Sequence, residues 1–266
     1  MHYYKATIQY DGTDYSGFQW QQGVETVQSA INAALARIHP GKISTAGASR
    51  TDAGVHAVDQ RLKMTTEWPF ECASFLPLFN DSLPAQIRCL DLAPCEGSYN
   101  PISHTVSKEY RYLFANTGKL AGADRRFVSN IANPLDDELM QACTQLVVGT
   151  HDFKNFVSTG SNVRSTIRDV RRCLLSTVVP QEIFPSPTLF QMPPTLTSCY
   201  QLEIAANGFL KQMIRHLVAA LWMVGSKKLS LDEFEEMLQG PLVEKRRWKV
   251  ASPRGLFLYK ITEALP

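Results

Sequence analysis

Short runs that alternate apolar and polar residues recur along this chain, and segments with helical spacing separate them. The first run covers Tyr3–Tyr10, and the first helical segment covers Thr26–Ile38. On that segment one face holds Val27, Ile31, Leu35 and Ile38. An element with one apolar face must bury it against another element. The mixture therefore predicts an α/β or α+β fold rather than a helical bundle or a β-sandwich.

The order of the expected elements is similar in the two halves of the chain. Between the halves lies the irregular segment 94–104, in which Pro94, Gly97 and Asn100-Pro101 favour a crossover. We therefore expect an amino-terminal domain over residues 1–105 and a carboxy-terminal domain over residues 106–266. The other expected strands cover 42–48, 60–64, 87–92, 106–114, 167–176, 197–206 and 256–261, and the other expected helices cover 71–80, 135–147, 208–224 and 231–239.

The segment 180–194 in the second half contains five prolines. It is too rich in proline for the interior of a helix or a strand, and we expect it to be an excursion on the surface. Its prolines are Pro180, Pro185, Pro187, Pro193 and Pro194.

Charge is distributed unevenly along the chain, although the net charge is only +2. Residues 1–105 contain 7 basic and 10 acidic side chains, whereas residues 106–266 contain 20 and 15. The second half is therefore the expected contact for a polyanion, although many enzymes have a solvated basic face and bind no nucleic acid.

Metal, disulfide and membrane classes find no support in the sequence. The six cysteines form no Cys-x-x-Cys pair and do not cluster with the six histidines, so we expect reduced thiols and no metal site. The most apolar stretch, 209–224, is interrupted by Lys211, Arg215 and His216, which excludes a membrane span. The chain enters a strand pattern at its first residues, which leaves no room for a secretory segment, and we expect a cytoplasmic protein.

The segment 48–57 is the strongest candidate for chemistry, because the motifs of nucleotide-binding loops, zinc proteases and serine hydrolases are missing. It reads Ala-Ser-Arg-Thr-Asp-Ala-Gly-Val-His-Ala, with small residues around Arg50, Asp52 and His56. Such a loop can approach a ligand closely. The alternative is an ordinary turn in which the carboxylate of Asp52 bonds nearby backbone amides.

This string resembles the signature of the tRNA pseudouridine synthase A family, Gly-Arg-Thr-Asp-Ala-Gly-Val-His-Ala. The departure is Ser49, where the family pattern has Gly, a residue that adopts backbone conformations other residues avoid. Segment 10–19 resembles the amino-terminal motif of the same family, with Phe18 in place of the usual Trp. Segments 108–112, 207–215 and 251–258 resemble its basic-tyrosine strand, its late helix and the start of its last strand.

The resemblance implies an isomerase that breaks the bond between C1′ and N1 of a uridine, turns the uracil and rejoins it through C5. Such a reaction needs no cofactor and no metal. The catalytic residue implied is Asp52, as a nucleophile or as a base. Its carboxylate must stay ionised in a shielded site, and by resemblance Arg215 supplies the nearby cation. The alternative for Arg215 is a solvated helix face that it shares with Lys211.

Two more residues have implied roles in substrate binding. Arg50 is placed to enter the base stack when the target uridine is extruded, and its alternative is a surface salt bridge. Tyr110 offers a flat ring that can stack on the everted uracil, and its alternative is a core aromatic. His56 is expected to be structural or to support the neighbouring residues.

The fold implied by the resemblance is α+β, the pseudouridine synthase fold, with two similar α/β halves whose mixed, mainly antiparallel sheets join across a central catalytic cleft. The resemblance also implies a homodimer that binds the tRNA anticodon stem-loop and modifies uridines 38, 39 and 40.

Two rival functions are a non-catalytic RNA-binding protein and a small-molecule enzyme that uses Asp52 as a base. Basic clusters expected to track the RNA backbone are Arg125-Arg126, Arg164/Arg168/Arg171/Arg172, Lys227-Lys228 and Lys245-Arg246-Arg247 with Lys249.

Overall fold

The computed structural model describes residues 1–116, 120, 123–160, 163–186, 188–243 and 246–264. The chain forms two compact units. The first unit contains Met1–Val106 together with Ser186–Phe190 and Phe257–Pro266, and the second contains Ser107–Pro185 and Gln191–Leu256. Two short segments from the second half of the sequence therefore belong to the first unit.

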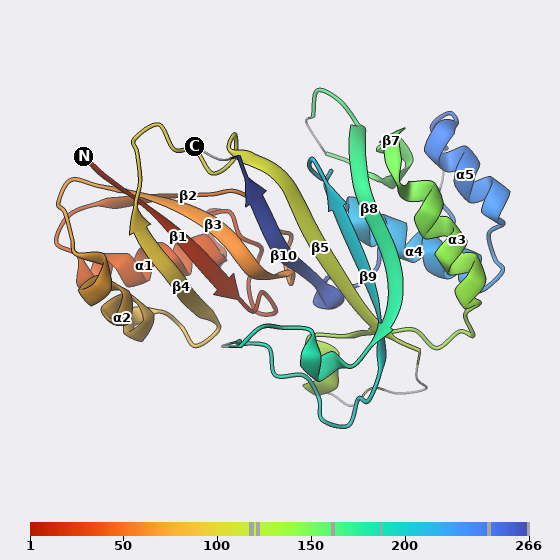
Figure 1. Cartoon of the computed structure of the whole chain (residues 1–266), viewed down its shortest axis with the longest axis horizontal. Helices are drawn as coiled ribbons and strands as arrows, with labels where there is room; N and C mark the ends of the chain where they lie inside the picture. Colours follow the sequence, from red (N-terminus) through yellow and green to blue (C-terminus); the bar gives the residue numbers. More distant parts are fainter. Residues whose placement is uncertain (117–119, 121–122, 161–162, 187, 244–245, 265–266) are drawn as a thin grey trace. The chain divides into compact units, whose positions relative to one another are not determined.

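In the first unit the sheet has the strand order β4-β1-β3-β10, and β2 also pairs with β3 (Figure 1). Strand β3 is the central strand of this unit, because it pairs with three other strands. It pairs antiparallel with β1 along its length, with β2 over its second half, and parallel with β10 at His56 and Ala57. The strands are β1 (His2–Tyr10), β2 (Ile43–Gly47), β3 (His56–Thr66), β4 (Ile87–Pro94) and β10 (Leu256–Glu263).

Two helices, α1 (Val27–Ile38) and α2 (Cys72–Ser82), pack against each other and against this sheet. Thr26 begins α1 with a capping box, since its hydroxyl accepts from the amide of Ser29 and the Ser29 hydroxyl accepts from the Thr26 amide. Most of the apolar face that the spacing predicts for α1 is buried. Val27, Ile31 and Leu35 are at most 1% exposed, and Ile38 at the end of the helix is half-buried.

In the second unit the strand order is β5-β9-β8-β7, and the short β6 pairs parallel with β5. The pairs β5–β9, β9–β8 and β8–β7 are antiparallel. The strands are β5 (Thr105–Ala115), β6 (Ser129–Asn130), β7 (Gly149–Asp152), β8 (Ile167–Val178) and β9 (Cys199–Ala206). Sequence periodicity predicts every long strand but not β6 and β7, which are too short to show alternation.

Helix α3 of the second unit packs against β8, α4 and α5. No helix in the described residues is long and apolar enough to cross a membrane. The elements are α3 (Asp137–Val147), α4 (Met213–Gly225) and α5 (Leu231–Gln239), with 3-10 turns η1 (Ala123–Arg126), η2 (Phe153–Phe156), η3 (Pro180–Glu182) and η4 (Pro253–Gly255).

The helix expected from residue 208 begins five residues later, at Met213, which corrects the sequence prediction. Gln212 has a left-handed backbone, with φ at 59°, and a residue in that conformation cannot continue a helix toward its amino terminus. Lys211 therefore lies outside α4, and the face it was expected to share with Arg215 does not exist.

The proline-rich segment is also more than the surface excursion that its composition predicts. Ile183, Phe184 and Met192 are buried, and Phe190 is 3% exposed. The Phe190 ring lies edge-on to Phe257 at 5.1 Å between centroids, inside the first unit. Prolines shape the backbone of this segment, but its apolar side chains have the usual reason to be buried. Pro187 lies outside the described residues.

Both units thus combine helices with a mainly antiparallel sheet, which confirms the expected α+β class. The parallel pairs are β3 with β10 and β5 with β6. The cleft between the halves stays a prediction.

Candidate functional site

Asp52 lies in a tight turn that immediately precedes β3. The amide of Val55 donates to the Asp52 carbonyl at 3.1 Å, and Gly54 has a positive φ of 76°, which glycine adopts without steric cost. The turn fixes the backbone on the carboxyl side of Asp52, and Asp52 itself is half-buried.

The amino-terminal motif, residues 10–19, lies directly against this turn. A Cβ atom on Gly12 would lie 1.9 Å from the Val55 carbonyl oxygen, and one on Gly17 would lie 2.9 Å from the Thr51 carbonyl oxygen. The Gly54 amide donates to the Tyr15 carbonyl at 3.3 Å. The two motifs, which 28 residues separate in the sequence, are therefore one structure, and the glycines permit its close backbone contact.

Two hydrogen bonds hold Thr51 of the loop against that motif. Its hydroxyl hydrogen-bonds the Tyr10 hydroxyl at 2.7 Å in the buried interior, and its carbonyl accepts from the Phe18 amide at 3.1 Å. Phe18 is 1% exposed, and its ring packs directly on Gly47. A Cβ atom on Gly47 would lie 2.3 Å from Cε1 of that ring. A phenylalanine thus performs the packing expected of the family's usual tryptophan.

Ser49, the departure from the family signature, has an ordinary backbone conformation. In the part of the chain that the structure describes, the non-glycine residues with positive φ are Gln212 and Lys227. Buried Gln60 holds Ser49 at both ends, because the Ser49 amide donates to Gln60 Oε1 at 3.0 Å and Gln60 Nε2 donates to the Ser49 carbonyl at 2.6 Å. A serine is therefore compatible with this loop.

His56 and Asp11 form a buried pair at the start of β3. His56 Nδ1 lies 3.1 Å from Asp11 Oδ1, with the two side chains 0% and 7% exposed. Burial opposes ionisation of Asp11, but hydrogen bonds from His56 and Thr13 outweigh it and hold the pKa of this carboxyl well below its usual range. The pair connects the first motif to the end of the Asp52 loop.

Arg50 and Tyr110 differ in exposure. Arg50, two residues before Asp52, is exposed. Tyr110 lies in β5 of the second unit, is 7% exposed, and contacts the Phe209 ring edge-on at 5.2 Å. On the same face of β5, burial lowers the pKa of Lys108 to about 8.

Arg215 is buried, so the alternative interpretation of this residue as part of a solvated helix face is wrong. It lies in the first turn of α4 and is 8% exposed. Its Nε donates to the Ala251 carbonyl at 2.7 Å, and the Ala251 amide donates to the Arg215 carbonyl at 3.2 Å. A guanidinium retained in such a position is held in one orientation.

A polar cluster that the sequence does not reveal stabilises the start of α4. The Ser158 hydroxyl donates to Gln212 Oε1 and lies 2.9 Å from His216 Nε2, so the proton of His216 is on Nε2 and points to Ser158. Among the described residues His216 Nδ1 has no hydrogen-bond partner. Burial, with Arg246 and Arg215 nearby, lowers the pKa of His216 to about 4.

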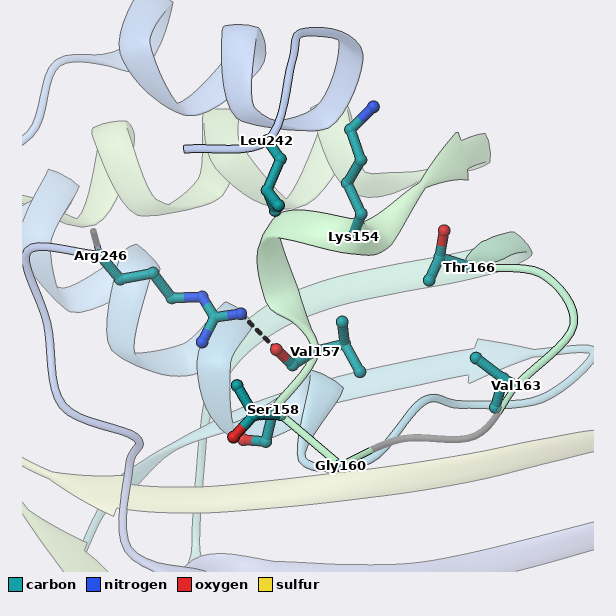
Figure 2. Close-up of a pocket in the computed structure, with 9 residues that line it drawn as sticks. Lys154, Val157, Ser158, Gly160, Val163, Thr166, Leu242 and Arg246 are labelled. Carbon is teal, nitrogen blue, oxygen red and sulfur yellow. Dashed lines mark hydrogen bonds between the residues drawn. The ribbon is translucent and has the colours of Figure 1, made fainter. Parts of the chain in front are cut away.

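A pocket of about 300 Å³ lies beside this cluster in the second unit (Figure 2). Arg246 forms part of its wall, donating to the carbonyls of Asn155 at 2.7 Å and of Val157. Figure 2 shows its guanidinium beside the Val157 carbonyl. The lining residues are Lys154, Val157, Ser158, Thr159, Gly160, Val163, Thr166, Leu242 and Arg246.

Most of the expected basic clusters make intramolecular contacts. Arg246 is a structural residue, whereas Arg164, Lys228 and Lys249 are exposed. Lys245 lies outside the described residues. The ion pairs are Arg171 with Asp169, Arg172 with Glu203, Lys227 with Asp136 and Arg247 with Glu233, and Arg125 and Arg168 donate to backbone carbonyls.

The structure thus divides the predicted site residues between the units. Asp52 and Arg50 belong to the first unit, and Tyr110 and Arg215 belong to the second. Sequence reasoning missed the supporting residues Gln60 and Ser158, because their partners are distant in sequence. The glycines of the first motif were the available signal for close backbone contact.

The chain matches the sequence model of the family described as tRNA pseudouridine synthase over residues 6–100 and 143–262. The tRNA pseudouridine synthase A 1 of Desulfotalea psychrophila is 32% identical over 259 residues, covering 96% of each chain. The tRNA pseudouridine synthase A of Thermoanaerobacter sp. strain X514 is 33% identical with the same coverage. That of Acetivibrio thermocellus is 30% identical, covering 97% of this chain and 98% of its own. Because the match includes the Asp52 loop and extends into both units, this chain belongs to the tRNA pseudouridine synthase family.

Proposed function

We propose that this chain isomerises uridine to pseudouridine in tRNA, with Asp52 as its catalytic carboxylate. The observation that carries the proposal is the contact between the two motifs of the first unit. Backbone hydrogen bonds, the buried Tyr10–Thr51 pair and the close approach of Gly12 and Gly17 hold the turn that presents Asp52. A carboxylate on a rigid backbone is preorganised for chemistry on a bound nucleotide.

The reaction is an isomerisation, so no atom is gained or lost. The C1′–N1 bond breaks, the uracil turns, a C1′–C5 bond forms, and the proton on C5 is transferred to N1. Asp52 serves either as the nucleophile or as the base that removes a sugar proton. Both roles require the ionised carboxylate.

The other predicted residues bind the substrate in this proposal. Arg50 is exposed on the same loop and enters the space that the extruded uridine leaves. Tyr110 stacks on the extruded uracil, and its edge-on contact with Phe209 holds the ring in position. Arg215 supplies the cation that keeps Asp52 ionised, and its hydrogen bond to Ala251 orients the guanidinium.

We further propose that the substrate is the anticodon stem-loop, with uridines 38, 39 and 40 as targets, and that the chain acts as a homodimer in the cytoplasm, where tRNA is found. The relatives' name, tRNA pseudouridine synthase A, supports tRNA as the substrate. Exposed basic side chains such as Arg164, Lys228 and Lys249 provide contacts for the phosphate backbone.

Unmodified tRNA incubated with the native protein, and mapped uridine by uridine, tests the proposal. Pseudouridine should form at positions 38, 39 or 40, and Asp52→Ala should lower the rate by about 10⁴-fold or more, because a single catalytic residue is removed. Asp81→Ala, an exposed carboxylate in α2 of the same unit, is the matched control and should leave the rate unchanged.

Native protein that binds tRNA and leaves every uridine unmodified would show a non-catalytic RNA-binding protein instead. If Asp52→Ala keeps full activity, the site assignment is wrong although the function stands. A tRNA affinity that does not change with salt concentration would favour the small-molecule enzyme.

A further inference from the structure

Trp20 is a large aromatic residue that the first unit leaves in solvent. Its side chain is 56% exposed, although it follows directly on the motif that holds the Asp52 loop. Isolated exposed apolar residues are common in proteins, so exposure alone assigns no role to this ring. Its neighbours and its backbone contacts decide the matter.

The Trp20 backbone is bonded to the side chain of Gln28, which two further hydrogen bonds hold in place. The Trp20 amide donates to Gln28 Oε1 at 2.9 Å, and Gln19 Nε2 donates to the same oxygen at 2.9 Å. Gln28 is only 6% exposed and is itself held by the carbonyl of Thr45, to which its Nε2 donates at 2.9 Å. A buried amide thus anchors the backbone that carries the exposed ring, which lowers the backbone entropy lost when a ligand binds to that ring.

The loop that carries Trp20 is closed by backbone hydrogen bonds. The Ser16 amide donates to the Glu25 carbonyl at 2.9 Å, and the Gln28 amide donates to the Phe18 carbonyl at 2.9 Å. The Phe18 amide in turn donates to the Thr51 carbonyl. Two residues of chain span at most about 7 Å, so the Trp20 backbone lies close to the residue that precedes Asp52.

Chemistry at this position fits RNA better than it fits another protein. Arg50, which adjoins Thr51, is exposed and is the residue proposed to enter the base stack at the target uridine, while the Trp20 indole offers a flat face for another nucleobase. Stacking on an aromatic ring is the usual way in which proteins hold unpaired bases. Resting on the proposed function, we propose that Trp20 stacks on an unpaired base of the RNA that neighbours the target uridine.

The chain contains a matched control in Trp68. This residue is 60% exposed and belongs to the same unit, but it follows the opposite end of β3 from the Asp52 loop. An eleven-residue strand such as β3 is roughly 33 Å long. A Cβ on Gly41 would lie 2.4 Å from Trp68 Cδ1, so this ring already packs on a backbone.

The test compares native protein with Trp20→Ala, Trp20→Phe and Trp68→Ala, using unmodified tRNA as the ligand and thermal unfolding to verify that each variant is folded. Trp20→Ala should weaken the affinity by about 5-fold to 150-fold, the effect of losing one stacked base. Trp20→Phe should retain most of the affinity, and Trp68→Ala all of it. The salt dependence of the affinity should be the same in Trp20→Ala and native protein, because a stacked base releases no counterions.

Trp20→Ala with native affinity overturns the proposal, and so does an equal loss in Trp68→Ala. A change in sedimentation with unchanged affinity would assign Trp20 to a contact between copies of the chain and would also overturn it. Trp20-dependent binding without any pseudouridine in the native protein supports the stacking contact and refutes the proposed function. Pseudouridine formation by a Trp20→Ala variant that binds tRNA normally does the reverse.

Discussion

Gly12 and Gly17 are the residues that allow the Asp52 turn to lie against the amino-terminal motif. Only Gly17 of the two has a positive φ, at 95°, whereas Gly12 is required by the space around it. The obstacle at Gly12 is a backbone carbonyl, which cannot rotate away as a flexible side chain would. A single methyl group at this position therefore has to displace the loop.

Replacing Gly12 by Ala should destabilise the protein by about 1–3 kcal/mol and lower pseudouridine formation, because the new Cβ would overlap the Val55 carbonyl at 1.9 Å. Denaturant unfolding and a rate measurement on tRNA would measure both effects. Gly208→Ala is the control, since the nearest atom to its Cβ is Arg168 Nε at 3.9 Å, and it should change stability by less than about 0.5 kcal/mol. Equal effects in the two variants would contradict this account of Gly12.

His216 makes the stability depend on pH. Its folded pKa of about 4 lies below the ordinary value of 6.5, so the unfolded chain binds more protons between these values. The contribution of His216 to the free energy of unfolding is therefore fully present above pH 6.5. It is lost as the pH falls toward 4, by up to about 3 kcal/mol. In His216→Gln, which keeps an amide donor for Ser158, this part of the decline should disappear from unfolding curves recorded between pH 4 and 7. An unchanged slope would show that His216 is not the group responsible.

At the scale of elements, α4 is bounded by two left-handed residues that are not glycine. Gln212 precedes the helix with φ at 59°, and Lys227 follows it with the same φ. At the carboxyl end the amide of Lys227 donates to Val224 and that of Lys228 to Met223, the two bonds of a Schellman motif. A left-handed residue other than glycine costs about 1–2 kcal/mol, so this helix end is not at its optimum.

Lys227→Gly should therefore stabilise the protein by about 0.5–1 kcal/mol, once the entropy of glycine in the unfolded chain is subtracted. The exposed ion pair of Lys227 with Asp136 offsets little of this gain. Thermal unfolding measures the shift. Lys228→Gly, the next residue, should give no gain because its φ is not positive. A lower midpoint for Lys227→Gly would indicate that the ion pair outweighs the backbone strain.

At the scale of the whole molecule, the two compact units do not correspond to two continuous stretches of the sequence. The first unit takes Ser186–Phe190 and Phe257–Pro266 from the second half of the chain. Strand β10 pairs with His56 and Ala57 at the end of the Asp52 loop, and Phe190 packs against the rings of His56 and Phe257. The fold of the Asp52 loop thus depends on contacts with the far end of the sequence.

Phe190→Ala should destabilise the protein by about 3–5 kcal/mol, the cost of a cavity left by a buried phenylalanine. It should also lower activity, because the cavity adjoins His56. Leu174→Ala, which truncates a side chain that is 49% exposed on β8, should change stability by less than about 0.5 kcal/mol. Urea unfolding monitored by circular dichroism measures both, and a native-like midpoint for Phe190→Ala would refute a core role for the proline-rich segment.

The amino-acid sequence by itself determined which stretches become long helices and strands, because burial of one face imposes a period that can be read locally. It also determined the family, since the Asp52 signature is a contiguous run. Only the tertiary structure decided the contact between the two motifs, the burial of Arg215, the late start of α4 and the packing of Phe190. Each of these depends on atoms that are distant in sequence, and no local period carries information about such partners. The side chain of Gln212 likewise accepts a hydrogen bond from Ser158, a residue 54 positions away in the sequence.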